Sequence, residues 1–89
     1  MNIQLVLAGH YTSCKETEKI WSVACLQHGI ELEVLNLEKP DGEMLSLELN
    51  ISSYPALIVN KIVKAVGNPD QDTANKIINK IVQENISGH

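Results

Sequence analysis

The residue with the clearest potential for chemistry is Cys14, in the segment GHYTSCKE at residues 9–16. This segment follows a short apolar run, and Ser13 and Glu16 have the spacing of a capping box, which begins a helix. The pattern predicts Ser13 as the N-cap and places Cys14 in the first helical turn. There the unpaired backbone N–H groups and the positive end of the helix dipole favour the thiolate, the nucleophilic form of cysteine.

Two neighbours in the sequence, His10 and Lys15, could support the thiolate of Cys14 through positive charge. Two roles for Cys14 remain open from the residues alone. It is either a lone redox thiol that forms a mixed disulfide with a partner, or a partly buried structural cysteine, since free cysteine is often buried. A metal site is not expected, because His10 and Cys14 offer two ligands where a closed zinc site needs four.

The second cysteine, Cys25, lies on the apolar face of the helix predicted after Ser13, together with Trp21 and Ala24. This position predicts packing in the core. On one helix, Cys14 and Cys25 would be separated by about 16 Å, whereas a disulfide needs Cα atoms within roughly 7 Å. The two cysteines are therefore not expected to pair.

The chain has 89 residues, of which 44% are hydrophobic and 20% are charged. This length and composition are typical of one ordinary globular domain. The net charge of −4 and the 3% content of aromatic residues argue against nucleic acid as a partner. No apolar run reaches the roughly 20 residues of a membrane-spanning helix, and the N-terminus lacks a signal-peptide pattern. We therefore expect a cytoplasmic location without a membrane partner. Because no glycine-rich phosphate loop is present, no cofactor is expected.

Seven elements are predicted to position these residues. Apolar or alternating runs predict four strands, at residues 3–8, 31–37, 55–59 and 61–66. Repeats three and four residues apart predict helices at residues 14–28 and 43–49. A third helix is predicted to start around Pro69, which Asn68 and Asp70 flank, and to carry an apolar stripe from Ala74 to Val82. The segment KPDG at 39–42 predicts a turn, and Gly29 predicts the end of the first helix. The domain is predicted to cover residues 1–85, with a frayed tail at 86–89.

The order of these elements is βαβαββα. The first strand, helix and strand imply two parallel strands joined by a right-handed crossover. The segments PALIV and KIVKAV, within residues 55–66, imply an antiparallel hairpin in the same sheet. The predicted fold class is therefore α/β, with a four-stranded mixed sheet flanked by three helices.

Three segments of this chain resemble the thioredoxin superfamily, above all its small, glutaredoxin-sized thioredoxin-like proteins. VLAGHYTSCKETEK, at residues 6–19, resembles the segment in which the family carries a CxxC dithiol followed by lysine. SSYPALIV, at 52–59, resembles the segment in which a cis-proline opens a strand opposite the dithiol. KIVKAVGNP, at 61–69, is similar to the family's last strand and the glycine before the last helix. The resemblance implies a thioredoxin-like fold.

The sequence departs from the CxxC motif at its first position. Aligned without gaps, Cys14 and Lys15 match the second cysteine and the lysine after it, and Tyr11 stands in place of the first cysteine. In the family the first cysteine is the low-pKa nucleophile and the second resolves the mixed disulfide. A phenol with a pKa of about 10 is not a disulfide nucleophile at neutral pH. The resemblance thus implies a degenerate site, with at most a monothiol, oxidoreductase-like thiol-disulfide exchange at Cys14.

Pro55 suggests an alternative function that needs no cysteine. The resemblance implies a cis peptide bond before Pro55, and a backbone at Tyr54 that pairs with an extended substrate strand. With Tyr11 expected near the same groove, the chain would be a non-catalytic binding module for a protein partner or for self-association. Under either hypothesis, the expected partner is a protein or a small thiol at the groove between Cys14 and Pro55.

Overall fold

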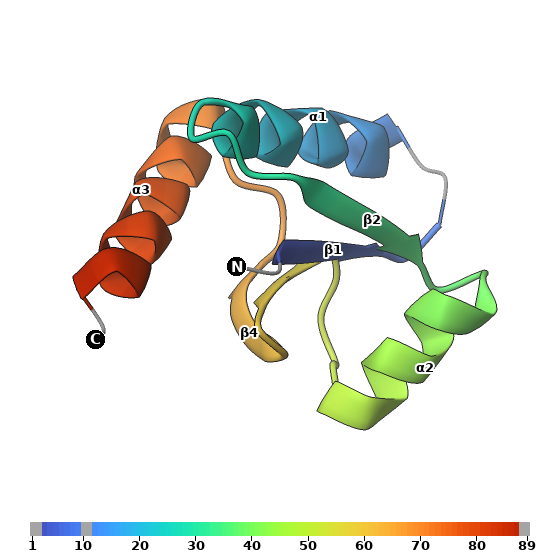
Figure 1. Ribbon diagram of the computed structural model, residues 1–89. Coiled ribbons are helices and arrows are strands. Elements are labelled where there is room, and N and C mark those ends of the chain that lie inside the picture. Colours follow the sequence, from blue (N-terminus) through green and yellow to red (C-terminus); the bar gives the residue numbers. More distant parts are fainter. Residues whose placement is uncertain (1–2, 10–11, 88–89) are drawn as a thin grey trace.

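The computed structural model describes the backbone of residues 3–9 and 12–87, and the side chains of residues 3–9 and 15–84. Its elements follow the predicted order βαβαββα (Figure 1). They are β1 (Ile3–Leu7), α1 (Thr12–Leu26), β2 (Leu32–Asn36), α2 (Pro40–Leu49), β3 (Ala56–Val59), β4 (Ile62–Val66) and α3 (Gln71–Ser87).

The four strands form one mixed sheet in the order β2-β1-β3-β4. β1 pairs with β2 in parallel, whereas the β1–β3 and β3–β4 pairs are antiparallel. The predicted fold class is therefore confirmed. The pairing of Val6 with Ala56 brings the beginning of β3, and Pro55 before it, to the end of β1 that leads into α1.

Helices cover both faces of the sheet, which explains the nearly continuous apolar sequence of β1. Ile3, Leu5 and Leu7 pack into the core beneath α1 and α3. Val6 points to the opposite face and packs against α2, in a smaller cluster. α1 and α3 thus share one side of the sheet, and α2 lies on the other (Figure 1).

Helix α1 ends where the sequence predicts, but it begins before the predicted position. At the C-terminal end, Gly29 has a φ of 64° and donates to Leu26 O at 3.0 Å, while Ile30 N donates to Cys25 O at 3.0 Å. These two bonds form a Schellman motif, so the predicted helix end at Gly29 is confirmed. At the N-terminal end, the predicted N-cap at Ser13 is wrong. The helix already begins at Thr12, and an N-cap residue must lie outside the helical backbone.

The segment KPDG forms the first turn of α2, so the prediction of a separate turn is wrong. Lys39 has extended backbone angles and precedes Pro40 at the first helical position, where proline's missing N–H has no cost. Asp41 and Glu43 place negative charge at the positive end of the helix. Gly42 is needed because a Cβ atom at this position would collide with the backbone of Asn36.

Strands β3 and β4 are joined by a two-residue turn at Asn60 and Lys61, which have φ values of 51° and 66°. Positive φ at both positions is what a type I′ hairpin turn requires. Leu57 pairs with Ala65 and Ile58 pairs with Val63, so Lys64 has no partner opposite it and forms a β-bulge.

Helix α3 begins with a side-chain cap, because Asp70 Oδ1 accepts a hydrogen bond of 2.8 Å from Thr73 N. The helix extends to Ser87, two residues into the segment predicted as a frayed tail.

Candidate functional site

The candidate site lies at the end of the sheet where β1 leads towards α1. Gly9, just after β1, is held by the neighbouring strand, because Asn36 Nδ2 donates to Gly9 O at 3.0 Å. Leu37 N also donates to Leu7 O at 2.8 Å, which continues the parallel pairing beyond β2. The chain therefore leaves the sheet at a fixed position before it enters the helix that contains Cys14.

Pro55 lies beside this exit. The Tyr54–Pro55 peptide bond is cis, and Pro55 is buried. Its carbonyl accepts a hydrogen bond of 2.8 Å from Gly67 N, which extends the β3–β4 pairing by one residue. Gly67 has a φ of 89°, in the left-handed region that favours glycine, and the chain there turns from β4 towards α3.

A buried hydrogen bond connects α1 to the segment that follows Gly67. The Thr17 hydroxyl donates to Asn68 Oδ1, and Thr17 is only 1% exposed. A second link runs from Gln71 Nε2 to Ile20 O at 3.0 Å. Because Thr17 lies one helical turn after Cys14, this bond fixes the N-terminal part of α1 against the beginning of the last helix.

The role of Thr17 was not predicted from the sequence, although a signal was present. Thr17 is a polar residue in the apolar repeat of α1, and a buried hydroxyl group requires a hydrogen-bond partner. The partner, Asn68, is 51 positions away along the chain. No local pattern could therefore have identified it.

The predicted site residues near α1 are described only in part. The backbone of Cys14 lies in the first turn of α1, as predicted, while its thiol lies outside the described residues. His10 and Tyr11 also lie outside them. Lys15 is exposed on α1.

Tyr54 uses its side chain to hold the loop before β3. Its half-buried phenol donates to Ile51 O at 3.1 Å and forms a hydrogen bond with the Ser46 hydroxyl of α2. Among the described residues, the backbone N–H and C=O of Tyr54 have no hydrogen-bond partner. The described hydrogen bonds of Tyr54 are therefore made by its phenol and not by its peptide groups.

Cys25 has a structural role, as predicted. It is 1% exposed and packs in the core between α1, α3 and the sheet. Burial raises the pKa of its thiol to about 11, because the interior disfavours the charged thiolate. Cys25 is therefore mostly a protonated, inaccessible thiol at neutral pH.

The described part of the chain contains neither a cluster of metal ligands nor a membrane-spanning helix. Among the described side chains, those of residues 3–9 and 15–84, no three or more His, Cys, Asp or Glu groups are placed so that they could hold a metal ion. None of the helices there is both long and apolar enough to cross a membrane.

The mixed sheet, its three helices and their order define the thioredoxin fold. The thioredoxin domain family matches residues 1–79, so this chain belongs to that family. Thioredoxin 1 from the thermophilic eubacterium Thermosipho africanus superposes with a TM-score of 0.73 over 98% of this chain and 100% of that one. With 12% sequence identity, this likeness shows the fold alone. No curated protein matches the sequence.

Proposed function

We propose that this thioredoxin-family protein binds an extended segment of a protein partner at Tyr54–Pro55, and that Cys14 is at most a monothiol centre. The observation that carries the proposal is the backbone of Tyr54, whose N–H and C=O have no hydrogen-bond partner among the described residues. Peptide groups beside a sheet that lack such partners can pair with an added strand. The phenol, by contrast, is already engaged with α2.

A second candidate function is monothiol exchange at Cys14. It is supported by the position of the Cys14 backbone in the first turn of a 15-residue helix, where the helix dipole favours thiolate. Tyr11, in the place of the family's first cysteine, leaves no second thiol nearby in sequence to resolve a mixed disulfide. An external thiol would have to complete the reaction, and the cytoplasm, our expected location, supplies such thiols.

The rate at which a thiol reagent labels Cys14 at different pH values separates these functions. Cys25 is buried with a pKa of about 11, so the native protein's fast labelling reports Cys14. A Cys14→Ser variant measures the background. An apparent pKa below about 7 with rapid labelling would support exchange, whereas slow labelling with a pKa near 8.5 or above would exclude it.

Strand addition at Tyr54 can be tested by tethering. Cys14 attacks an extended peptide that carries a pyridyl disulfide, pyridinethione leaves, and the peptide stays attached through the new disulfide. We expect hydrogen exchange at the Tyr54 amide to slow at least about tenfold, as pairing protects amides. Cysteamine, attached in the same way, is the control. Equal exchange with peptide and cysteamine would reject strand addition.

A Tyr11→Cys variant tests the alignment and gives a second anchor for the tether. It restores a CxxC spacing, so we expect it to gain insulin disulfide reductase activity that the parent lacks. If neither activity nor an internal disulfide between Cys14 and the new cysteine appears, Tyr11 does not occupy the first cysteine position. If Cys14 itself cannot be labelled, the peptide is attached at this introduced cysteine instead.

A further inference from the structure

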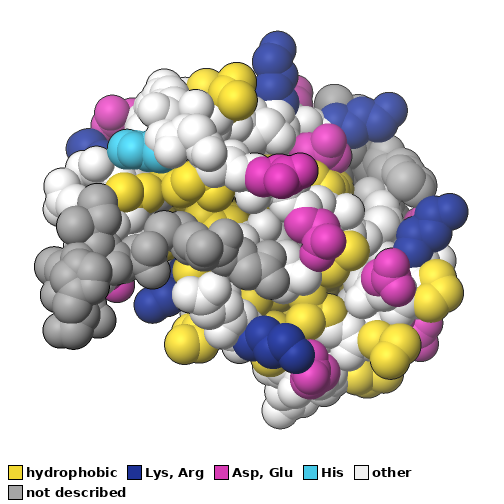
Figure 2. All heavy atoms as spheres, in the orientation of Figure 1, with side chains coloured by type: hydrophobic (Ala, Val, Ile, Leu, Met, Phe, Trp, Pro, Cys, Tyr) yellow, Lys and Arg dark blue, Asp and Glu magenta, His cyan; other side chains and the backbone are white. Residues whose placement is uncertain are grey.

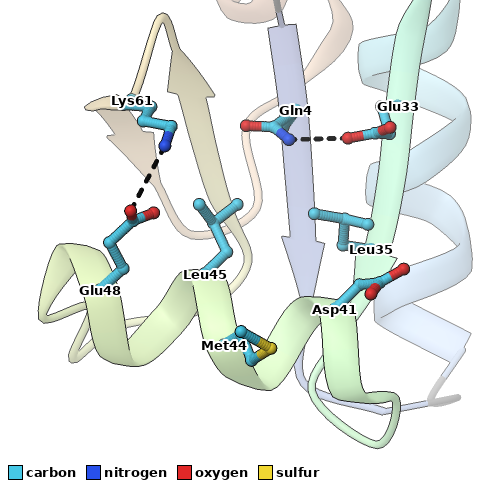
Figure 3. Close-up of a pocket in the computed structure, with 8 residues that line it drawn as sticks. All are labelled: Gln4, Glu33, Leu35, Asp41, Met44, Leu45, Glu48 and Lys61. Atoms are coloured by element: carbon cyan, nitrogen blue, oxygen red, sulfur yellow. Dashed lines mark hydrogen bonds and ion pairs between the residues drawn. The ribbon is translucent and has the colours of Figure 1, made fainter.

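A hollow lies on the α2 side of the sheet, away from Pro55. It has a volume of about 490 Å³ and is bounded by β1, β2, α2 and the β3–β4 turn (Figure 3). Leu35 and Leu45 form its apolar floor, and Met44 stands at its edge on α2 (Figure 3). α2 therefore covers only part of this face of the sheet.

The polar side chains around the hollow are mostly acidic. Glu33, Asp41 and Glu48 supply three carboxylates against the single ammonium of Lys61, a net charge of −2. Lys61 Nζ lies 3.3 Å from Glu48, so that pair is internally balanced. Glu33 accepts a hydrogen bond of 2.7 Å from the neutral amide of Gln4, and no lysine among the described residues forms an ion pair with it (Figure 3).

Apolar surface continues from the hollow onto the outside of α2. Met44 is 69% exposed and Leu47, one turn further along the helix, is 75% exposed. Figure 2 shows apolar side chains gathered over α2, with acidic side chains between α2 and β2. Methionine adapts its shape easily and is common at surfaces that bind varied partners.

A second, smaller hollow of about 330 Å³ shares Leu35 and Asp41 with the first and continues over the edge of β2. It adds the carboxylate of Glu18 and the ammonium of Lys39, so the combined surface keeps its net charge of −2. An acidic surface repels phosphate groups, which argues against nucleic acid and anionic lipid as ligands.

We call the larger hollow, with Met44 at its edge, the α2 groove. We propose that it docks a basic segment of a protein partner. An apolar side chain of the partner would lie on Leu35 and Leu45, and flanking Lys or Arg residues would lie beside Glu33 and Asp41. Charge complementarity identifies the partner's chemistry, and the apolar floor supplies the anchor. The groove is separate from Tyr54–Pro55, so a partner could use both surfaces or either one alone.

The test uses a short labelled peptide in which a leucine pair is flanked by lysines, in a glycine and serine background. Titration into ¹⁵N-labelled protein should shift the amide signals of Leu35, Asp41 and Met44, and added salt should weaken binding. A peptide with glutamate in place of lysine should bind at least about tenfold more weakly, since each exposed charge contact contributes roughly 0.2–1 kcal/mol.

Variants of the protein test separately how the charged and the apolar side chains of the groove contribute to peptide binding. Glu33→Lys should weaken binding about fivefold, whereas Glu84→Lys, the same charge change on α3, should weaken it less than about twofold. Met44→Ser should also weaken binding, while Leu26→Ser, at a 76% exposed position on α1, should not. All four side chains are exposed, so the fold should tolerate these changes.

Three results would overturn the proposal. Signal shifts could cluster around Tyr54 and Gly67 instead of α2, or the glutamate peptide could bind as well as the lysine peptide. Shifts at the groove could also appear without peptide as protein concentration rises, which would identify a second copy as the occupant. If the tethered peptide fails to protect the Tyr54 amide, the proposal for the α2 groove is unaffected, so the two proposals can fail independently.

Discussion

The hydrogen bond between Thr17 and Asn68 predicts an unequal effect of removing either partner. Thr17→Val replaces the buried hydroxyl with a methyl group of similar shape, and Asn68 is exposed, so water can satisfy its amide. We expect a loss of about 0.5–1 kcal/mol in unfolding free energy. Asn68→Ala leaves the Thr17 hydroxyl buried without its partner, which should cost about 1–3 kcal/mol.

The double variant gives the sharper test, because Thr17→Val should rescue Asn68→Ala. With both polar groups removed, no buried hydroxyl is left unsatisfied, and the stability should return to that of Thr17→Val alone. Urea unfolding followed by the fluorescence of Trp21 measures all three variants. Trp21 is the only tryptophan and is 1% exposed, so its emission reports loss of the core.

The expected shift in the urea midpoint is about 1–3 M for Asn68→Ala and below about 1 M for Thr17→Val, since m is about 1 kcal/mol/M in a chain of this size. Asn79→Ala, at an exposed position of α3, controls for loss of an asparagine and should change little. If Asn68→Ala is no more harmful than Thr17→Val, the hydroxyl has found another acceptor, such as a carbonyl in the preceding turn, and our reasoning is refuted.

Three further predictions concern single positions. Gly42→Ala should lower stability by about 1–3 kcal/mol in the same urea assay, although alanine usually stabilises a helix, because the Cβ meets the Asn36 backbone; a more stable variant would contradict the observed packing. Lys61→Gly should raise the melting temperature slightly, because relief of a left-handed lysine outweighs its exposed ion pair; a lower value would reverse that ranking. Hydrogen bonds from the Thr73 side chain and backbone lower the pKa of Asp70, so the stability advantage over Asp70→Ala should be full above about pH 3.9 and vanish as the pH falls through the folded pKa. An advantage that persists in stronger acid would exclude this cap.

The parts of the fold that sequence predicted well rest on local patterns. The apolar runs of β1 and β3 and the three-and-four-residue repeat of α3 each indicate an element and its buried face. Gly29 was recognisable because a left-handed residue after a helix strongly favours glycine. These signals require no knowledge of what the segment packs against.

The errors concern positions that distant contacts decide. Gly42 looked like part of a turn, because the sequence does not show that the backbone of Asn36 passes close to it. Pro40 is a valid signal for the start of a helix, but Gly42, two residues later, favours a turn when only the local sequence is considered. In the candidate site, the position of Pro55 could be inferred from the resemblance. The partners of Thr17 and of the Tyr54 phenol could not, because they depend on how helices and loops meet in three dimensions.

The bulge at Lys64 has a consequence for how copies of this protein meet. β4 lies at the edge of the sheet and exposes Ile62 and Val66, at 58% and 54%, so it offers an apolar template for aggregation. Lys64 is the middle residue of this strand. If two β4 strands paired antiparallel about their centres, their lysines would face each other, and like charges in that position repel. Lys64, which has no partner opposite it in its own sheet, thus opposes pairing between the β4 edge strands of two copies.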